Sequence, residues 1–300
     1  MTRLRADLIL LIAALVWGLG FVAQSTAMDN IGPFTFIGLR FLIAAAAVWP
    51  LMRFIENRNT ALVPMSRSDL RMSMLIGLVF FCGCAFQQWG IVSTTVTNAG
   101  FLTGLYVVMV PFIVWMLYRK PPPAAVWPAA LMSVAGTFLL GGGGLNPIGA
   151  GDLLIICGSI FWALHVTLIG LVAVRSRRPL QIAAIQFAVC GVCGIILGFA
   201  LEQPGWRAIS AAMPEILYAG LIGGALGFTL QTIGQRDTPA ADAAIILSGE
   251  GVFAALFGAW LLSERLGVAG AIGAGMILAA ILLVELAPLA RRKPVSPAGT

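Results

Sequence analysis

The chain has 300 residues, of which 60% are hydrophobic and 10% are charged, and its mean hydropathy is +0.98. A soluble domain carries about 25% charged residues, so this composition excludes a soluble globular protein and indicates that lipid covers much of the surface. The net charge of +6 comes from basic residues scattered between apolar runs. A nucleic-acid reader would need a basic stripe or an aromatic-basic module, so we expect no nucleic-acid partner.

Ten segments are long and apolar enough to cross a bilayer, which takes about 20 mostly apolar residues. In chain order they are 7–27, 33–53, 70–92, 97–117, 124–141, 151–172, 180–201, 212–234, 239–262 and 267–287. Glycine- and proline-rich joints separate them. We interpret the first segment as a span, because its apolar run is longer than a signal-peptide core and has a counterpart inside the chain. The pattern predicts an all-α membrane protein with ten transmembrane helices.

Lysine and arginine are distributed unevenly between the two sides of the predicted membrane. With the N-terminus inside, fifteen of the eighteen basic residues fall in inner segments, against two in outer segments and Arg40 within a span. An excess of Lys and Arg marks the cytoplasmic side. We therefore predict a multi-pass protein of a bacterial inner (plasma) membrane, with cytoplasmic N- and C-termini and a basic cytoplasmic tail at 291–300.

An internal repeat relates the two halves of the chain. Asp7 and Trp17 lie ten residues apart, and Asp152 and Trp162 repeat both the residue types and the spacing. Five spans fall in each half, and an odd number of spans places the second half in the membrane upside down. Two inverted five-helix repeats, at 1–145 and 146–290, are therefore expected. Many secondary transporters have this architecture and hold substrate between the halves near the midplane.

Several segments of the chain match a known family. They are Leu15–Phe21, Gly38–Ala44, Gly249–Leu256 and Trp260–Leu266. Through them the whole chain resembles the EamA-type ten-span exporters of the drug/metabolite transporter superfamily. It departs from the family pattern at Lys120, where the first half often carries a glutamate, and at Gly251, where proline is frequent. The resemblance implies export of small metabolites across the inner membrane, among them amino acids, including aromatic ones.

Three ionisable side chains lie well inside predicted spans, where a charge costs about 2.5–3.5 kcal/mol and usually faces a cavity or a partner. Glu250 is interpreted either as a proton-coupling or substrate-amine group, or as a carboxylate that locks helices together by pairing with Arg40. Arg40 itself either contacts substrate, pairs, or snorkels outward. His165 lies one turn past Trp162 and is either a protonatable gate or a hydrogen-bonded packing residue.

The remaining candidate residues are expected to form the walls of a substrate pocket. Trp17 and Trp162 lie too deep for interfacial anchors, and we expect them to face each other across the axis between the halves. The other wall candidates are Phe21, Gln24, Gln87, Gln88, Asn98 and Tyr106. The alternative for each of them is core packing or hydrogen bonding between helices.

The sequence lacks the signatures of an enzyme or a metal site. It has no His-Glu-x-x-His or Gly-x-Ser-x-Gly motif, one histidine, and five cysteines that all lie in apolar segments. We expect no catalytic residues, metal or cofactor; the partners are a small-molecule substrate and the lipid bilayer, and the oligomeric state is left open. The predicted function is a secondary transporter that exports small amphipathic metabolites by alternating access, with amino acids, including aromatic and hydrophobic ones, as first choice. A lipid or larger-metabolite flippase and a channel are the alternatives.

Overall fold

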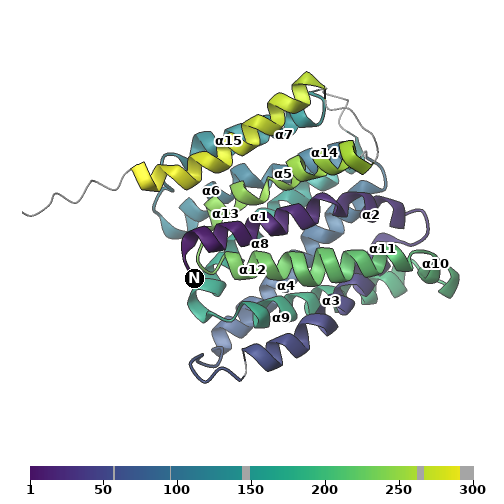
Figure 1. The fold of residues 1–300 in the computed structure, drawn as a ribbon. Helices are drawn as coiled ribbons and strands as arrows, with labels where there is room; N and C mark the ends of the chain where they lie inside the picture. Colours follow the sequence, from purple (N-terminus) through teal and green to yellow (C-terminus); the bar gives the residue numbers. More distant parts are fainter. Residues whose placement is uncertain (57, 95, 144–148, 262–266, 291–300) are drawn as a thin grey trace, which may run out of the picture.

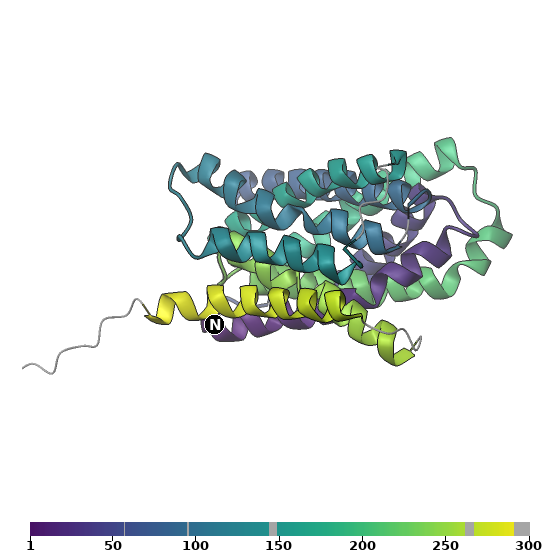
Figure 2. The same cartoon turned by 90° about the horizontal axis from the view of Figure 1, so that it is seen from above.

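The computed structural model describes residues 1–56, 58–94, 96–143, 149–261 and 267–290, and all regular secondary structure in these ranges is helical. The helices of the first half are α1 (Arg3–Gly18), α2 (Gly20–Ala27), α3 (Pro33–Ile55), α4 (Arg67–Ile91), α5 (Val96–Gly104), α6 (Tyr106–Tyr118) and α7 (Val126–Leu140). Those of the second half are α8 (Ala150–Ser176), α9 (Pro179–Leu201), α10 (Trp206–Ala211), α11 (Met213–Leu217), the π-helical η1 (Tyr218–Phe228), α12 (Thr229–Gly234), α13 (Ala240–Leu247), α14 (Glu250–Leu261) and α15 (Val268–Ala290). Most of them run roughly along one direction and form a single bundle (Figures 1 and 2).

Among the described residues, eight helical segments are long and apolar enough to cross a membrane, and they coincide with eight of the predicted spans. They are Pro33–Ile55, Arg67–Ile91, Ala99–Tyr118, Ala150–Ser176, Pro179–Leu201, Met213–Gly234, Ala240–Phe257 and Val268–Ala287. The fifth predicted span contains the apolar but shorter helix α7, which has 15 residues. The first predicted span is divided at Leu19 into α1 and α2. A polytopic helical membrane protein is thus confirmed, while the count of ten spans stays a prediction.

Helix α15 illustrates why the outer surface of the bundle needs lipid. Its buried face carries Ile277, Ala280 and Val284, and its opposite face exposes Leu278 and Leu282. A helix that is apolar on both faces is stable only where a second apolar medium covers the outer one. The exposed leucines therefore place this face against hydrocarbon.

Helices α3 and α9 occupy equivalent places in the repeat, run antiparallel and cap each other. Glu56 directly follows α3 and accepts hydrogen bonds from the backbone N–H groups of Leu180 and Gln181, at 2.7 and 3.0 Å. In the reverse direction, Glu202 follows α9 and accepts from the backbone N–H and hydroxyl of Thr35, at 2.8 and 2.6 Å. First-turn N–H groups have no partner inside their own helix, and a carboxylate there also opposes the helix dipole. Each helix end thus stabilises the start of its counterpart.

A second contact also occurs once in each half. Gly90 of α4 lies so close to α8 that an added Cβ atom would be 2.5 Å from Cγ1 of Ile155, and a Cβ at Gly234 of α12 would be 2.6 Å from Cγ of Leu10 on α1. Each residue of the first contact is 144 or 145 positions from its counterpart in the second. The packing of α4 on α8 is therefore reproduced by α12 on α1.

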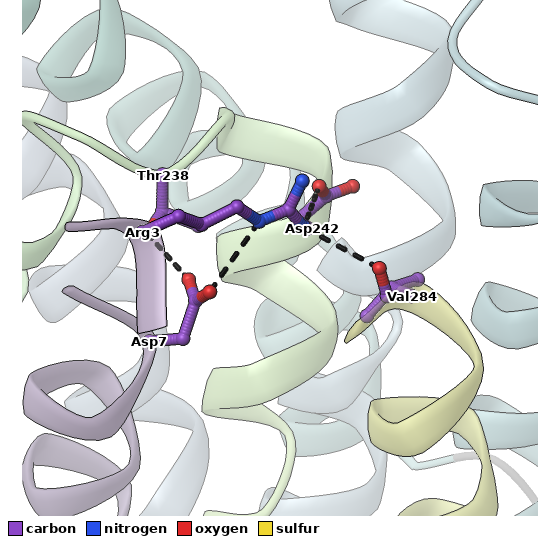
Figure 3. Close-up of polar contacts among 5 residues, drawn as sticks. All are labelled: Arg3, Asp7, Thr238, Asp242 and Val284. Carbon is purple, nitrogen blue, oxygen red and sulfur yellow. Dashed lines mark hydrogen bonds and ion pairs between the residues drawn. The ribbon is translucent and has the colours of Figure 1, made fainter. Parts of the chain in front are cut away.

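The chain begins, and α15 ends, at the same end of the bundle (Figure 1). There the Arg3 guanidinium donates to Asp242 at 2.6 Å, to Asp7 at 3.4 Å and to the carbonyl of Val284 at 3.4 Å, and the Thr238 hydroxyl donates to Asp7 at 2.5 Å (Figure 3). These bonds join α1 to α13, to the turn before it and to α15. We call Asp7 and Thr238 the N-terminal pair.

The opposite end of the bundle carries the repeat-related counterpart of this pair. The Thr94 hydroxyl, in the turn after α4, donates to the carboxylate of Asp152 near the start of α8. Asp152 also accepts from the backbone N–H of Gly149 at 2.9 Å. Thr94 and Asp152 are the equivalents of Thr238 and Asp7 in the repeat, and we call them the opposite pair.

Candidate functional site

A cavity of about 80 Å³ lies between the two halves. It is lined by Trp17, Gly20, Phe21, Gln24, Arg40, Phe41, Gln87, Thr103, Tyr106, Trp162, Val166, Ala219, Gly223, Phe228, Gln231, Leu247 and Glu250. Since a buried water needs about 10–15 Å³ measured in this way, the space admits several water-sized groups. Its walls combine aromatic rings, amides, one guanidinium and one carboxyl group.

Many of these lining residues are related to each other by the repeat. Pairs that are 144 or 145 residues apart are Trp17 with Trp162, Phe21 with Val166, Gln87 with Gln231, Thr103 with Leu247, and Tyr106 with Glu250. Equivalent positions of the two halves therefore meet around one space. Transporters with internal repeats bind their substrates at this kind of location.

Three helix interruptions lie beside the cavity. Helix α1 gives way to α2 at Leu19, α5 to α6 at Leu105, and α13 to α14 at Ser248. Each of these residues keeps right-handed helical backbone angles, so the interruptions are local changes in the helical hydrogen-bond pattern. A glycine adjoins each of them. Backbone groups that lose their helical partners are tolerated at membrane depth where they face protein or a polar cavity.

The aromatic wall is built around Phe228. Its ring lies 4.5 Å from the ring of Trp17 and 5.8 Å, nearly parallel, from that of Trp162. The Trp17 indole N–H donates to the carbonyl of Gly223 at 3.0 Å, which fixes Trp17 against η1. The indole N–H of Trp162 has no hydrogen-bond partner within the described ranges. Both tryptophans line the cavity, and the Phe228 ring contacts both, tilted against Trp17 and stacked on Trp162.

Arg40 and Glu250 bring a guanidinium and a carboxyl group to the same cavity. The Arg40 side chain is 6% exposed, and its guanidinium carbon lies 4.8 and 4.7 Å from the ring centres of Phe36 and Phe41. Glu250 is the first residue of α14. The ion pairs between described residues include neither side chain, so the Arg40–Glu250 pair that the sequence suggested is not formed in this structure.

Two predicted site residues, His165 and Gln88, lie outside the cavity wall, and a third has a side chain that is not described. His165 is fully buried and its Nε2 lies 2.8 Å from Oε1 of Gln186. Gln88 donates its amide N–H to the backbone carbonyl of the wall residue Gln24 at 2.9 Å, so it supports the wall from behind. The side chain of Asn98 falls outside the described residues. The other eight candidates line the cavity.

Several wall residues were missed by the sequence analysis. The offset between the two repeats would have identified some of them. Gln231 lies 144 residues after Gln87, and Thr103 lies 144 residues before Leu247. Applying the offset to every polar candidate would have selected Gln231. Phe41 is an ordinary apolar residue in an apolar span, and nothing in the sequence separates it from a lipid-facing phenylalanine.

Paired repeats, interrupted helices and a mixed aromatic and polar cavity define a polytopic helical membrane protein of the transporter class. The EamA-like transporter family matches residues 4–142 and again 149–286. The chain belongs to this family and carries its domain twice, so the resemblance found in the sequence is confirmed.

Relatives and a solved structure extend this similarity over nearly the whole chain. An uncharacterized transporter of Archaeoglobus fulgidus is 32% identical over 286 residues, covering 95% of this chain and 87% of the relative. The uncharacterized transporter YwfM of Bacillus subtilis is 25% identical over 287 residues, covering 94% of each chain. A crystal structure at 17% identity has a TM-score of 0.78 and covers 97% of this chain and 100% of its own, which shows a common fold. The protein is a membrane transporter.

Proposed function

We propose that the protein is a secondary transporter that exports small amphipathic metabolites, chiefly amino acids with aromatic or other hydrophobic side chains, by alternating access. The observation that carries the proposal is the cavity between the halves, which combines an aromatic wall with Arg40 and Glu250. An apolar body that carries one positive and one negative group matches such a lining. Interrupted helices of both halves at the cavity supply the structural change that alternating access requires.

The proposal includes ten membrane crossings in two inverted repeats, with both termini in the cytoplasm of a bacterial inner membrane. The antiparallel α3 and α9 with their reciprocal caps support the inversion, and the bond from Arg3 to the carbonyl of Val284 places α1 and the end of α15 together. The basic inner segments support the orientation. A fluorescent protein fused to the C-terminus should fluoresce and alkaline phosphatase fused there should be inactive; the reverse result would contradict the orientation.

The function is tested by flux into proteoliposomes. Labelled amino acids, nucleobases and sugars are offered with and without an imposed pH gradient, and empty liposomes are the control. Saturable uptake of hydrophobic or aromatic amino acids is expected. If folded protein takes up no compound of the panel and scrambles lipid in the same vesicles, the proposal is wrong and the protein is a flippase. Unitary currents in a planar bilayer would show instead that it is a channel.

Glu250 is the proposed coupling group, because it brings a carboxyl to the cavity at the position where the first half has the neutral Tyr106. Glu250→Gln keeps the shape of the side chain and removes its titration. The variant should still exchange labelled for unlabelled substrate but lose accumulation driven by the pH gradient. Accumulation equal to that of the unmodified protein would refute coupling through Glu250 and leave the substrate class standing.

A further inference from the structure

The Arg40 guanidinium is buried in the cavity wall without a protein anion beside it. Within the described part of the chain no carboxylate oxygen lies within 4.0 Å of it, and its Nε has no hydrogen-bond partner. Its neighbours are the rings of Phe36 and Phe41 and the thiols of Cys84 and Cys190. Rings and thiols do not replace the hydration that a buried cation loses. An anion that entered the cavity beside Arg40 would therefore stabilise its buried charge.

Two other arginines show how this fold can satisfy a guanidinium with a carboxylate, while the buried Arg178 donates to the backbone carbonyls of Val63 and Leu62. Arg3 is paired with Asp7 and Asp242, and Arg175 is paired with Asp69. Those arginines lie at the ends of the bundle and are more exposed than Arg40. Arg40 is more deeply buried than Arg3 and Arg175 and would gain more from a carboxylate, but no described carboxylate is paired with it.

The internal repeat supplies a comparison for the same helix position. Gln186 is the equivalent of Arg40, seven residues past the first proline of α9, and its amide oxygen lies 2.8 Å from Nε2 of His165. Gln186 is fully buried away from the cavity lining. The fold therefore accepts a neutral side chain at this repeat position. Helix packing does not require the positive charge of Arg40, which is present only in the half where this position lines the cavity.

We propose that Arg40 binds the carboxylate of the transported molecule, so that the cavity selects organic carboxylates over the corresponding amides and amines. The inference rests on the proposed function for the use of the cavity, and it assigns one subsite within it. A guanidinium presents parallel N–H donors that match a carboxylate in two-pronged geometry. The aromatic wall of Trp17, Phe228 and Trp162 then receives the apolar part of the substrate.

The test compares one apolar body with and without a carboxylate. Binding of L-phenylalanine, 3-phenylpropionate, L-phenylalaninamide and 2-phenylethylamine is measured on the purified full chain in nanodiscs. The two carboxylates should bind about 10- to 100-fold more tightly than the amide and the amine, because a hydrogen-bonded charge pair is replaced by an unpaired buried cation. Equal affinities across the four compounds, or no binding by either carboxylate, would overturn the inference.

Variants then connect the preference to Arg40. Arg40→Met keeps an unbranched apolar chain as far as the position of Nε and removes the guanidinium group. It should reduce the preference for carboxylates to about onefold while the amine still binds, which also shows that the variant is folded. Arg40→Lys should retain part of the preference if the methionine variant does not fold. Arg58→Met is the matched control, since Arg58 also stacks on a ring, that of Phe54 at 4.8 Å, but on the surface. A preference that survives in both Arg40 variants would refute the assignment. Transport of the amide or the amine as efficiently as the two carboxylates would also refute it, although the transport function would stand.

Discussion

Trp17 and Trp162 occupy equivalent repeat positions, yet their indole N–H groups have different surroundings. That of Trp17 is bound to the carbonyl of Gly223 in η1. That of Trp162 has no partner in the described part of the cavity wall, and a donor in this position gains free energy when a ligand supplies an acceptor. At the scale of single residues, we therefore expect the first tryptophan to hold the wall together and the second to offer its N–H group to a ligand.

This difference predicts opposite effects of the same substitution. Trp17→Phe leaves the Gly223 carbonyl without its donor and should lower the stability by about 1 kcal/mol. Trp162→Phe removes no hydrogen bond within the described part of the protein, so stability should be unchanged while affinity for the transported molecule falls. Thermal unfolding in detergent and equilibrium binding measure the two quantities. A stability loss confined to the Trp162 variant would contradict this assignment of roles.

The sequence could identify the polar and ionisable members of the wall because lipid makes such residues conspicuous. Gln87, Arg40 and Glu250 stand out in apolar spans for this reason. It could not distinguish Gln88, which adjoins Gln87 but supports the wall through the backbone of Gln24. Neighbouring helix positions point about 100° apart, and without the packing of the helices the cavity side of α4 is unknown.

At the scale of helices, small residues decide how closely α7 and α15 approach. Gly136 and Gly273 face each other across this contact, and a Cβ atom at Gly273 would collide with the Gly136 carbonyl and lie 2.6 Å from the backbone nitrogen of Leu140. Backbone atoms of a packed helix cannot move aside without separating the pair. Close approach through small residues is a main source of helix association in membranes.

Gly273→Ala should therefore lower the stability by about 1–3 kcal/mol through overpacking. Gly275→Ala is the matched control on the same helix, because nothing lies within 4 Å of its added Cβ; alanine also favours the helix there. Thermal unfolding of both variants in the same detergent provides the comparison. Equal losses in both would show that the contact with α7 does not limit the stability.

Hydropathy and breakers predicted most helices, but not where the helices are interrupted. Gly20 follows the interruption at Leu19 and an added Cβ there would meet only Nε2 of Gln24, at 3.8 Å. Gly38 lies in the continuous helix α3 and packs so closely that an added Cβ would be 2.6 Å from the backbone nitrogen of Ile195. A glycine in a membrane span can thus permit either a break or a close contact. The choice depends on the neighbouring helix, which the local sequence does not encode.

The cap that Glu56 provides for α9 predicts a pH dependence. Burial raises the pKa of the Glu56 carboxyl above its ordinary value of 4.5, although the N–H groups of Leu180 and Gln181 and the charges of Arg178 and Arg236 act to lower it. The folded state then holds this proton more tightly than the unfolded chain does. Its contribution to stability is complete below pH 4.5 and is lost as the pH rises through the raised pKa.

Glu56→Gln removes this titration and leaves an amide that still accepts a hydrogen bond. The melting temperature of the unmodified protein minus that of the variant should therefore fall as the pH rises from about 4 to about 7. Unfolding in detergent across this range measures the difference. A difference that rises with pH would mean that the hydrogen bonds to the ionised carboxylate, and not burial, determine the direction of the pKa shift of Glu56.

At the scale of the whole molecule, the repeat provides related polar contacts at the two ends of the bundle. The N-terminal pair joins Asp7 to Thr238, and the opposite pair joins Asp152 to Thr94. Each pair connects the start of a long helix of one half to a turn of the other half. A hydrogen bond to a charged acceptor contributes about 1.5–3 kcal/mol. The two pairs can therefore bias, in opposite directions, which end of the cavity is closed.

Thr238→Val and Thr94→Val test this balance, since each removes one hydroxyl and keeps the shape of the side chain. The reporter is Gly223→Cys in a chain without other cysteines, because a Cβ there projects into open space at the cavity wall. Thr238→Val should increase labelling by an impermeant thiol reagent from the side of the N-terminus, and Thr94→Val should increase it from the other side. Each increase should be about tenfold or more, because the state that is open at the end without its hydrogen bond becomes more populated. Thr137→Val is the control, because its hydroxyl bonds within α7 to the carbonyl of Ser133. Increases on the same side in both variants would indicate general loosening of the bundle, and would rule out the two pairs as opposing closures.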